Sequence, residues 1–182
     1  EWDATYGAAY RACIDAGAMT VMAGHIMQPA YSRKLNPDIQ DQDILPATLS
    51  YELITKLLKG QMGFNGLVVT DATTMAGMTI PMPRSQAVPQ TIAAGCDIFL
   101  FTRNLEEDFG YMQQGIADGV ITPERLNEAL TNILALKAAL NLHQKKAERR
   151  LVPTLAEALE RLGTAEHKAW ALECADKAIT LV

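Results

Sequence analysis

One aspartate, Asp71, follows a predicted strand that could hold its carboxylate rigidly enough to act in catalysis. Asp71 comes directly after the segment 67–70, whose first three residues form a short apolar run entered through glycines. An unbroken apolar run of this length is typical of a strand buried on both faces. In a sheet covered by helices, ligands bind beyond the carboxyl ends of the strands, so a carboxylate there can act as a nucleophile on rigid support. The alternative is that Asp71 only caps the next helix.

Two further candidates lie near the ends of predicted strands. His25 follows the segment 18–24, which has the pattern of a strand, and Met75 comes four residues after Asp71. A lone histidine in such a position is more often a hydrogen-bonded structural residue than a catalyst. By composition alone, Met75 fits the core better than the floor of a pocket. We keep both residues as binding candidates.

Arg103 is placed by a third predicted strand. The segment 96–101 is rich in apolar residues and indicates another buried strand, with Arg103 just past its carboxyl end. Its guanidinium could bind a carboxylate or a hydroxyl group of a ligand. Pairing with Glu106 or Glu107 is the simpler alternative, since exposed ion pairs are common and contribute little energy.

Composition argues against several classes of function. The chain has 182 residues and a formal net charge of −5. No cluster of Lys and Arg is interleaved with aromatic residues, which argues against a nucleic-acid groove and an anionic membrane surface. No run approaches the roughly 18 apolar residues that a membrane span needs. We predict a soluble protein without nucleic-acid or membrane partners, and its compartment, cytoplasmic or exported, stays open.

Neither a cofactor nor a metal is predicted. His25, His143 and His167 lack the close spacing of metal ligands. The three glycines in 60–66 precede a predicted strand, whereas the glycines of a dinucleotide fingerprint follow one. No Gly-x-Ser-x-Gly elbow of a serine hydrolase occurs.

Helical and strand patterns alternate along the chain, which predicts a parallel α/β sheet. Helices are expected at 3–16, 50–60, 88–94, 105–117, 122–140 and 164–177, and a final strand is expected to begin in 178–182. The polar, proline-containing stretch 28–46 is expected to be a long loop.

Several apolar side chains are predicted to face the core because they recur at helical spacing. They are Leu53, Ile54, Leu57 and Leu58; Leu126, Ala129, Leu130, Ile133, Leu134 and Leu140; and Ala165, Ala169, Leu172 and Ala175. The three cysteines are odd in number and widely spaced, which argues against a disulfide framework. Cys13 and Cys96 lie among apolar neighbours and are expected in the core.

Several segments together resemble glycoside hydrolase family 3. The segment 63–71, Gly-Phe-Asn-Gly-Leu-Val-Val-Thr-Asp, matches the motif that ends in the catalytic nucleophile of this family, with Asp71 in that position. Residues 22–25 match a Met-x-x-His strand, and residues 46–50 match a Pro-Ala-[Ser/Thr]-Leu-Ser run. The segments "AAGCDIFLF" and "ALECADKAITLV" extend the resemblance over nearly the whole chain.

The resemblance implies the fold. Three parallel strands cannot close a barrel of eight, so the chain corresponds to the last three β/α units of a TIM (β/α)8 barrel, an incomplete barrel fragment with a helical connector. Residues 1–140 would form the C-terminal part of the catalytic domain, and residues 141–182 a linker and the start of a second α/β domain. The exposed strand edge of such a fragment is expected to self-associate or to pair with the missing half-barrel.

The resemblance also implies a reaction. Retaining glycoside hydrolysis needs a carboxylate nucleophile, here Asp71, and a proton donor. His25, Met75 and Arg103 would lie on the side of the carbohydrate substrate. The family places the proton donor on a His of a Lys-His-x-x-Gly-His-Gly-type loop or on an acid of the second domain. Neither segment is within this sequence, so the fragment itself is expected to be inactive.

The residues around His25 and Asp71 favour one branch of the family. Gly-His-Ile at 24–26 together with Thr-Asp-Ala at 70–72 resembles the β-N-acetylhexosaminidase branch, whereas glucosidases more often have a Ser-Asp-Trp segment. We therefore predict cleavage of terminal β-linked N-acetylhexosamine. A β-glucosidase or β-xylosidase of the same family and a non-catalytic sugar-binding or assembly module are the alternatives.

Overall fold

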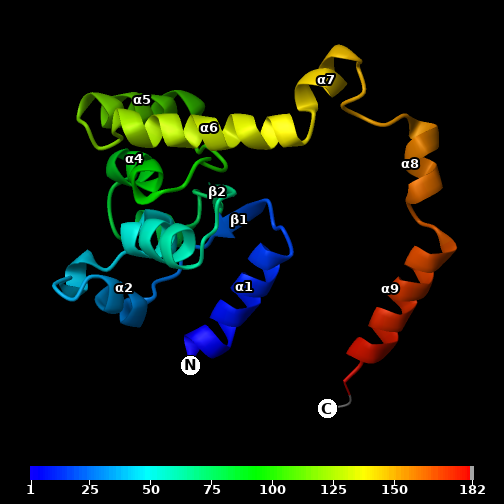
Figure 1. Ribbon diagram of the computed structural model, residues 1–182, viewed down its shortest axis with the longest axis horizontal. Coiled ribbons are helices and arrows are strands. Elements are labelled where there is room, and N and C mark those ends of the chain that lie inside the picture. Colours follow the sequence, from blue (N-terminus) through cyan, green and yellow to red (C-terminus); the bar gives the residue numbers. More distant parts are fainter. Residues whose placement is uncertain (181–182) are drawn as a thin grey trace. The chain divides into compact units, whose positions relative to one another are not determined.

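Two parallel strands, β1 (Thr20–Ala23) and β2 (Leu67–Thr70), form the sheet of the computed structural model, which describes residues 1–180 (Figure 1). The strands pair in register from their first residues to their last. Because they are parallel, their carboxyl ends lie at the same edge of the sheet. His25 and Asp71 follow those two ends, where the sequence predicted them.

The predicted third strand is reduced to one parallel bridge between Val69 and Ile98. The backbone N–H of Leu100 donates to the side-chain Oγ1 of Thr70 at 2.9 Å, where a longer strand would have a backbone-to-backbone bond. Phe101 then has a φ of +59°, in the left-handed region, which ends the extended backbone. The prediction of a full strand was wrong because side-chain bonds and this turn replace the regular ladder.

One face of the strands packs on η4 (Glu52–Gln61), a π-type helix. Its apolar stripe is buried as predicted, at Leu53, Ile54, Leu57 and Leu58. Ser50 stabilises the start of this helix, because its Oγ accepts the backbone N–H of Leu53 at 3.3 Å. Met22 of β1 is 53% exposed, so the strands are covered unevenly.

The helix before β1, α1 (Tyr6–Asp15), follows the short helix η1 (Trp2–Ala4). Gly7 of α1 is buried, and a Cβ on it would lie 2.8 Å from the ring of Trp2. Cys13 is exposed, so its predicted place in the core is wrong. The helix turns only the face that carries Gly7 toward η1, and Cys13 lies outside that contact.

The stretch 28–46, predicted as a loop, contains α2 (Pro29–Leu35) and η2 (Asp41–Asp43), and η3 (Ala47–Leu49) follows it. Pro29 stands in the first turn of α2, where its missing N–H is not needed. Tyr31 is buried with its ring edge-on to Trp2, at 4.8 Å between centroids. The prediction was wrong because this contact with a residue distant in sequence supports a helix of polar composition.

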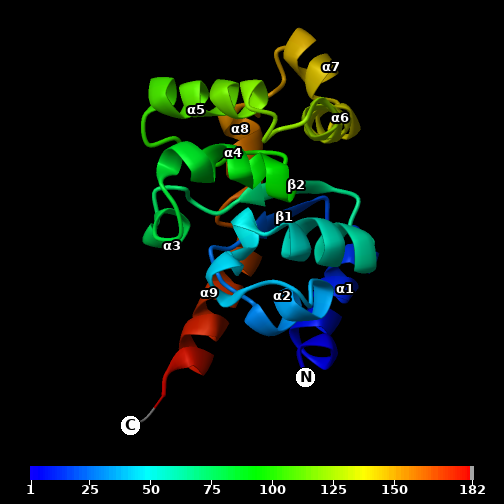
Figure 2. The ribbon, with the colours of Figure 1, turned by 90° about the vertical axis from the view of Figure 1, so that its left-hand side faces the viewer.

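Helices α4 (Arg84–Ala94) and α5 (Leu105–Ala117) pack against each other (Figure 2). The bounds predicted for α5 are confirmed, but α4 begins four residues earlier than predicted and holds Pro89 in its interior. A Cβ on Gly115 would lie 2.3 Å from the Cβ of Pro89. The absence of a side chain at Gly115 therefore allows the two helices to approach closely.

Helix α6 (Pro123–Ala139) begins as predicted, with the Oγ1 of Thr122 accepting the backbone N–H of Arg125 at 3.2 Å. Its predicted inner face is only partly covered. Ala129 is buried, and Leu126 and Ile133 are half-buried, whereas Leu130, Leu134 and Leu140 are exposed. The prediction was wrong for these three because the described residues leave the side of α6 that carries Leu130 and Leu134 open to solvent, and Leu140 lies past the end of the helix.

The chain divides into two compact units, Glu1–Lys137 and the residues from Ala138 on. The second unit contains α7 (Leu142–Ala147), α8 (Leu155–Arg161) and α9 (Ala165–Ala178). Helix α9 lies where a helix was predicted, but its predicted inner residues, Ala165, Ala169, Leu172 and Ala175, are exposed because no described element packs on them. Ile179 and Thr180 have no regular structure, and the last two residues of the predicted strand lie outside the described residues.

Residues 1–180 contain neither a membrane-spanning helix nor a cluster of metal ligands. No helix there combines the length and apolar character needed to cross a bilayer. No three His, Cys, Asp or Glu side chains of these residues are arranged to hold a metal ion.

Candidate active site

Asp71 lies at the edge where β1 and β2 end. Its backbone N–H donates to the carbonyl oxygen of Ala23, the last residue of β1, at 2.8 Å. Its Oδ1 accepts the backbone N–H of Ala72 at 2.7 Å, and the residue is half-buried. The next helix, α3 (Ala76–Thr79), has Met75 as its N-cap residue. The alternative prediction that Asp71 caps the next helix is therefore wrong.

His25 reaches from the end of β1 to the loop that carries Asp71. Its Nε2 lies 3.0 Å from the carbonyl oxygen of Ala72, and its Nδ1 lies 2.7 Å from the Oγ1 of Thr48. Because a carbonyl oxygen only accepts, Nε2 carries a proton, and in the neutral ring Nδ1 accepts the proton of the Thr48 hydroxyl. Both ring nitrogens are thus engaged by the protein, which is the structural role that the sequence favoured for His25.

Met75 and Arg103 are exposed on loops at the same end of the strands. Met75 is 48% exposed, so its predicted place in the core is wrong, because it precedes a one-turn helix at the surface. Among residues 1–180, the side chain of Arg103 forms no ion pair with Glu106 or Glu107, whose backbone N–H groups bond to Asn104. Substrate binding by His25, Met75 and Arg103 stays a prediction.

A buried ion pair that sequence reasoning missed lies beside these loops. The Nε and Nη2 of Arg84 each lie 2.7 Å from a carboxylate oxygen of Asp108. The two side chains are 9% and 2% exposed. Burial raises the pKa of Asp108, but hydrogen bonds from Arg84 and from the backbone N–H of Arg103 outweigh it and hold the pKa below its ordinary value. The partners are 24 residues apart, so no local pattern could reveal the pair.

Thr73 connects Arg84 to the loop that carries Asp71. The Nη1 of Arg84 donates to the carbonyl oxygen of Thr73 at 2.7 Å, and its Nη2 donates to the hydroxyl oxygen of Thr73 at 3.1 Å. The backbone N–H of Thr73 donates to the carbonyl oxygen of Leu100 at 3.2 Å. Its hydroxyl donates to the carbonyl oxygen of Phe101. Arg84 therefore holds a residue that joins the two loops.

A second buried ion pair lies nearer the amino end of β2. Asp97 pairs with Arg125 and, at 3.5 Å, with Lys59. Its Oδ2 accepts the backbone N–H of Val68 at 2.9 Å, so it completes the bonding of a strand residue. Cys96 is buried beside it, and burial raises the pKa of this thiol to about 12. These contacts describe a structural cluster with a protonated, unreactive thiol.

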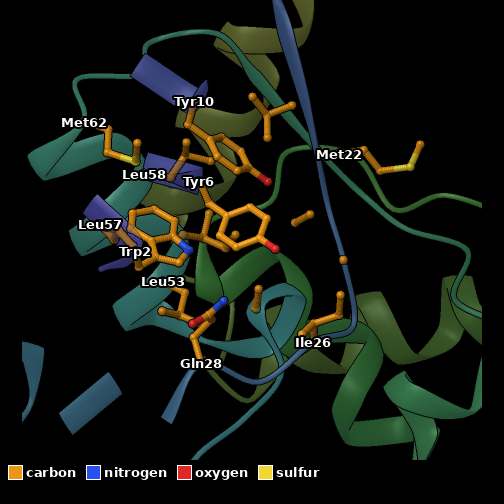
Figure 3. Close-up of a pocket in the computed structure, with 15 residues that line it drawn as sticks. Trp2, Tyr6, Tyr10, Met22, Ile26, Gln28, Leu53, Leu57, Leu58 and Met62 are labelled. Atoms are coloured by element: carbon orange, nitrogen blue, oxygen red, sulfur yellow. The ribbon is translucent and has the colours of Figure 1, made fainter. Parts of the chain in front are cut away.

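The cavity in Figure 3 is separate from the candidate residues. It has a volume of about 450 Å³ and lies between α1, β1 and η4. The aromatic rings of Trp2, Tyr6 and Tyr10 face the apolar side chains of η4, while Met22 points away from them. Its lining includes none of Asp71, His25, Met75 and Arg103. No Asp, Glu, His, Lys or Cys lines it, so we interpret this cavity as a packing surface rather than a catalytic site.

The chain matches a known family over its first unit. The sequence profile described as "Glycosyl hydrolase family 3 N terminal domain" matches residues 1–136. The chain belongs to this family. The resemblance to glycoside hydrolase family 3 that the motifs indicated is therefore confirmed, and the domain is of the TIM-barrel type.

Two relatives similar to this chain are much longer than it. The "Beta-N-acetylglucosaminidase/beta-glucosidase" of Cellulomonas fimi is 58% identical over 182 residues, which is 100% of this chain and 31% of the relative. The "Beta-hexosaminidase A" of Pseudoalteromonas piscicida is 30% identical over 172 residues, 89% of this chain and 27% of the relative. The chain thus spans less than a third of the length of these relatives.

Two solved structures are similar to this chain and are also much longer than it. The structure described as "Beta-glucoside phosphorylase BglX bound to 2FGlc" matches with a TM-score of 0.91 and 48% identity, over 100% of this chain and 32% of that chain. A β-N-acetylglucosaminidase of the family from Paenibacillus sp. str. FPU-7 matches with a TM-score of 0.60 and 30% identity, over 71% of this chain and 23% of that chain.

Proposed function

We propose that this chain is the part of a retaining glycoside hydrolase that carries the nucleophile, Asp71, for cleavage of terminal β-linked N-acetylhexosamine. The observation that carries the proposal is the position of Asp71, half-buried directly after β2 in a loop bonded to the end of β1. Family membership and the names of the two relatives support the reaction class.

The chemistry assigns one step to this chain. The carboxylate of Asp71 attacks the anomeric carbon, the bond from that carbon to the leaving oxygen breaks, and a glycosyl ester forms on Asp71. The leaving oxygen takes a proton from a donor that we assign to another segment of the longer protein. Water activated by that same group then cleaves the ester.

The neighbouring residues would orient Asp71 and the sugar. The backbone N–H of Ala72 donates to Oδ1 of Asp71, which leaves the second carboxylate oxygen available for attack. His25 fixes the carbonyl group of Ala72. Met75 and Arg103, exposed on the adjoining loops, would contact the sugar ring and its hydroxyl groups.

We further assign the chain to the last three β/α units of a (β/α)8 barrel, inactive until the remaining units join it. The outer edge of β1, the exposed Met22 and the apolar cavity beside Trp2 would then meet the missing half-barrel. Light scattering of the isolated chain tests this: a purely monomeric, cooperatively folded chain would contradict it. Co-expression with the preceding half of the longer protein is expected to yield a stable complex.

Phosphorolysis of a β-glucoside is a second candidate function. It is favoured by the TM-score of 0.91 over the whole chain to a structure described as a β-glucoside phosphorylase. In this reaction a phosphate oxygen, in place of water, would take the glycosyl group from Asp71. The product would be a sugar 1-phosphate.

The deciding experiment uses the longer protein that contains this chain. Aryl N-acetylglucosaminide and aryl glucoside are offered with and without inorganic phosphate, and the released sugars are identified. Preference for the N-acetylglucosaminide with free sugar as product supports our proposal, and a sugar 1-phosphate supports the second candidate. Asp71→Asn is expected to abolish turnover in either case. A folded protein that binds N-acetylglucosamine without turnover on either substrate would indicate a sugar-binding module.

A further inference from the structure

The geometry points to Arg84 and Asp108 as positioning residues that set the nucleophile loop, an inference that rests on the proposed role of Asp71. Arg84 binds both the carbonyl oxygen and the hydroxyl oxygen of Thr73, two residues after Asp71. Asp108 binds the backbone N–H of Arg103 at 2.9 Å. One ion pair therefore holds the loop after β2 and the loop that carries Arg103.

The guanidinium of Arg84 has little freedom to move. Its Nε, Nη1 and Nη2 each lie 2.7 Å from an acceptor on Asp108 or Thr73. A planar, two-point contact between a guanidinium and a carboxylate fixes the orientation of both groups, which the point charge of a lysine cannot do. Because both side chains are buried, water competes weakly for these bonds.

The hydrogen bonds of Arg84 and Thr73 support an unusual backbone conformation at Phe101. Its φ of +59° is uncommon for a residue other than glycine, and such conformations persist only when surrounding contacts over-determine them. The hydroxyl of Thr73 donates to the carbonyl oxygen of Phe101. Arg84 orients that hydroxyl, so it acts on the loop after β2 and on the loop that Phe101 opens.

The chain offers a matched control in the pair of Arg125 and Asp97. It is also a buried arginine–aspartate pair, and it also binds backbone, through the N–H of Val68 and the carbonyl oxygen of Cys96. It lies nearer the amino end of β2 and has no bond to either loop at the candidate site. Substitutions in the two pairs should reduce stability alike, but only one pair should affect chemistry.

The experiment compares Arg84→Lys, Asp108→Asn and Arg125→Lys in the longer protein that contains this chain, with Asp71→Asn alongside. We expect Arg84→Lys and Asp108→Asn to lower kcat about 10- to 100-fold per folded molecule, since small displacements of a reacting group have effects of this size. KM should change far less than kcat. Arg125→Lys should lower the melting temperature and leave kcat unchanged at a temperature where all variants are folded.

Hydrogen–deuterium exchange gives a readout that does not depend on activity. The backbone amides of 71–75 and 101–104 should exchange faster in Arg84→Lys and Asp108→Asn than in Arg125→Lys. The positioning role would be overturned if these segments exchanged at equal rates in all three variants. It would also be overturned if kcat fell in each variant only in proportion to the loss of folded protein. If Asp71→Asn retains turnover, the proposed nucleophile fails instead, and the exchange data still decide the role of Arg84.

Discussion

The ring of His25 connects the ends of the two strands, since its Nε2 lies 3.0 Å from the carbonyl oxygen of Ala72, the residue after Asp71. Its other nitrogen meets the hydroxyl group of Thr48 at 2.7 Å. Three segments distant in sequence are therefore held at one point beside the proposed nucleophile.

Removing the Thr48 hydroxyl should release the ring of His25. Thr48→Val keeps the shape of the side chain but leaves Nδ1 without its donor, which is expected to cost about 1–3 kcal/mol of unfolding free energy. Nitrogen NMR of His25 should show a single tautomer protonated at Nε2 in the unchanged protein and a mixture in the variant. A ring protonated at Nδ1 in the unchanged protein would contradict the bond to Ala72.

The contact between α4 and α5 should not tolerate a methyl group at Gly115. Gly115→Ala would bring a Cβ within 2.3 Å of the Cβ of Pro89, and we expect a loss of about 1–3 kcal/mol of unfolding free energy from overpacking. Gly110→Ala is the control on the same helix, because nothing lies within 4 Å of its added Cβ. That variant should gain about 0.5–1 kcal/mol from its helix propensity. Equal effects in urea unfolding would contradict the close approach.

The ion pair of Asp108 should make the stability of the folded protein depend on pH in the acidic range. Because the pKa of Asp108 is lowered on folding, the folded state binds fewer protons than the unfolded state near the ordinary pKa of this group. Its stabilising contribution is therefore complete above about pH 4 and is lost as pH falls through the lowered value. The melting temperature should fall more steeply below about pH 4 in the unchanged protein than in Asp108→Asn. Parallel curves would show that Asp108 does not contribute.

Thiol labelling should separate the three cysteines. Cys13 and Cys174 are exposed, whereas Cys96 is buried, and burial raises its pKa to about 12. In the isolated folded chain, a disulfide reagent at pH 8 is expected to modify Cys13 and Cys174 quickly and Cys96 only after unfolding. Rapid labelling of Cys96 in the folded chain, located by peptide mass, would show that the core around it opens.

Local sequence patterns were sufficient to predict much of the fold. The apolar run before Asp71, the leucine stripe of η4 and the Thr122–Pro123 start of α6 all encode their structure within a few residues. The motif that ends in Asp71 also indicated the family. These features could be predicted because hydrophobic periodicity and capping act between neighbours in the chain.

Contacts between distant residues decided the rest. Trp2 supports α2 through its contact with Tyr31. The bond to Thr70 and the turn at Phe101 shorten the third strand. Arg84 forms an ion pair with Asp108, which lies on another helix. The exposure of α9 likewise depends on which elements pack against it. By itself, the sequence determined the helices and strands that local periodicity and capping specify, and the residues whose side chains could do chemistry, because those properties are local. Only the tertiary structure decided which of these residues meet, because burial and ion pairing depend on segments that come together when the chain folds.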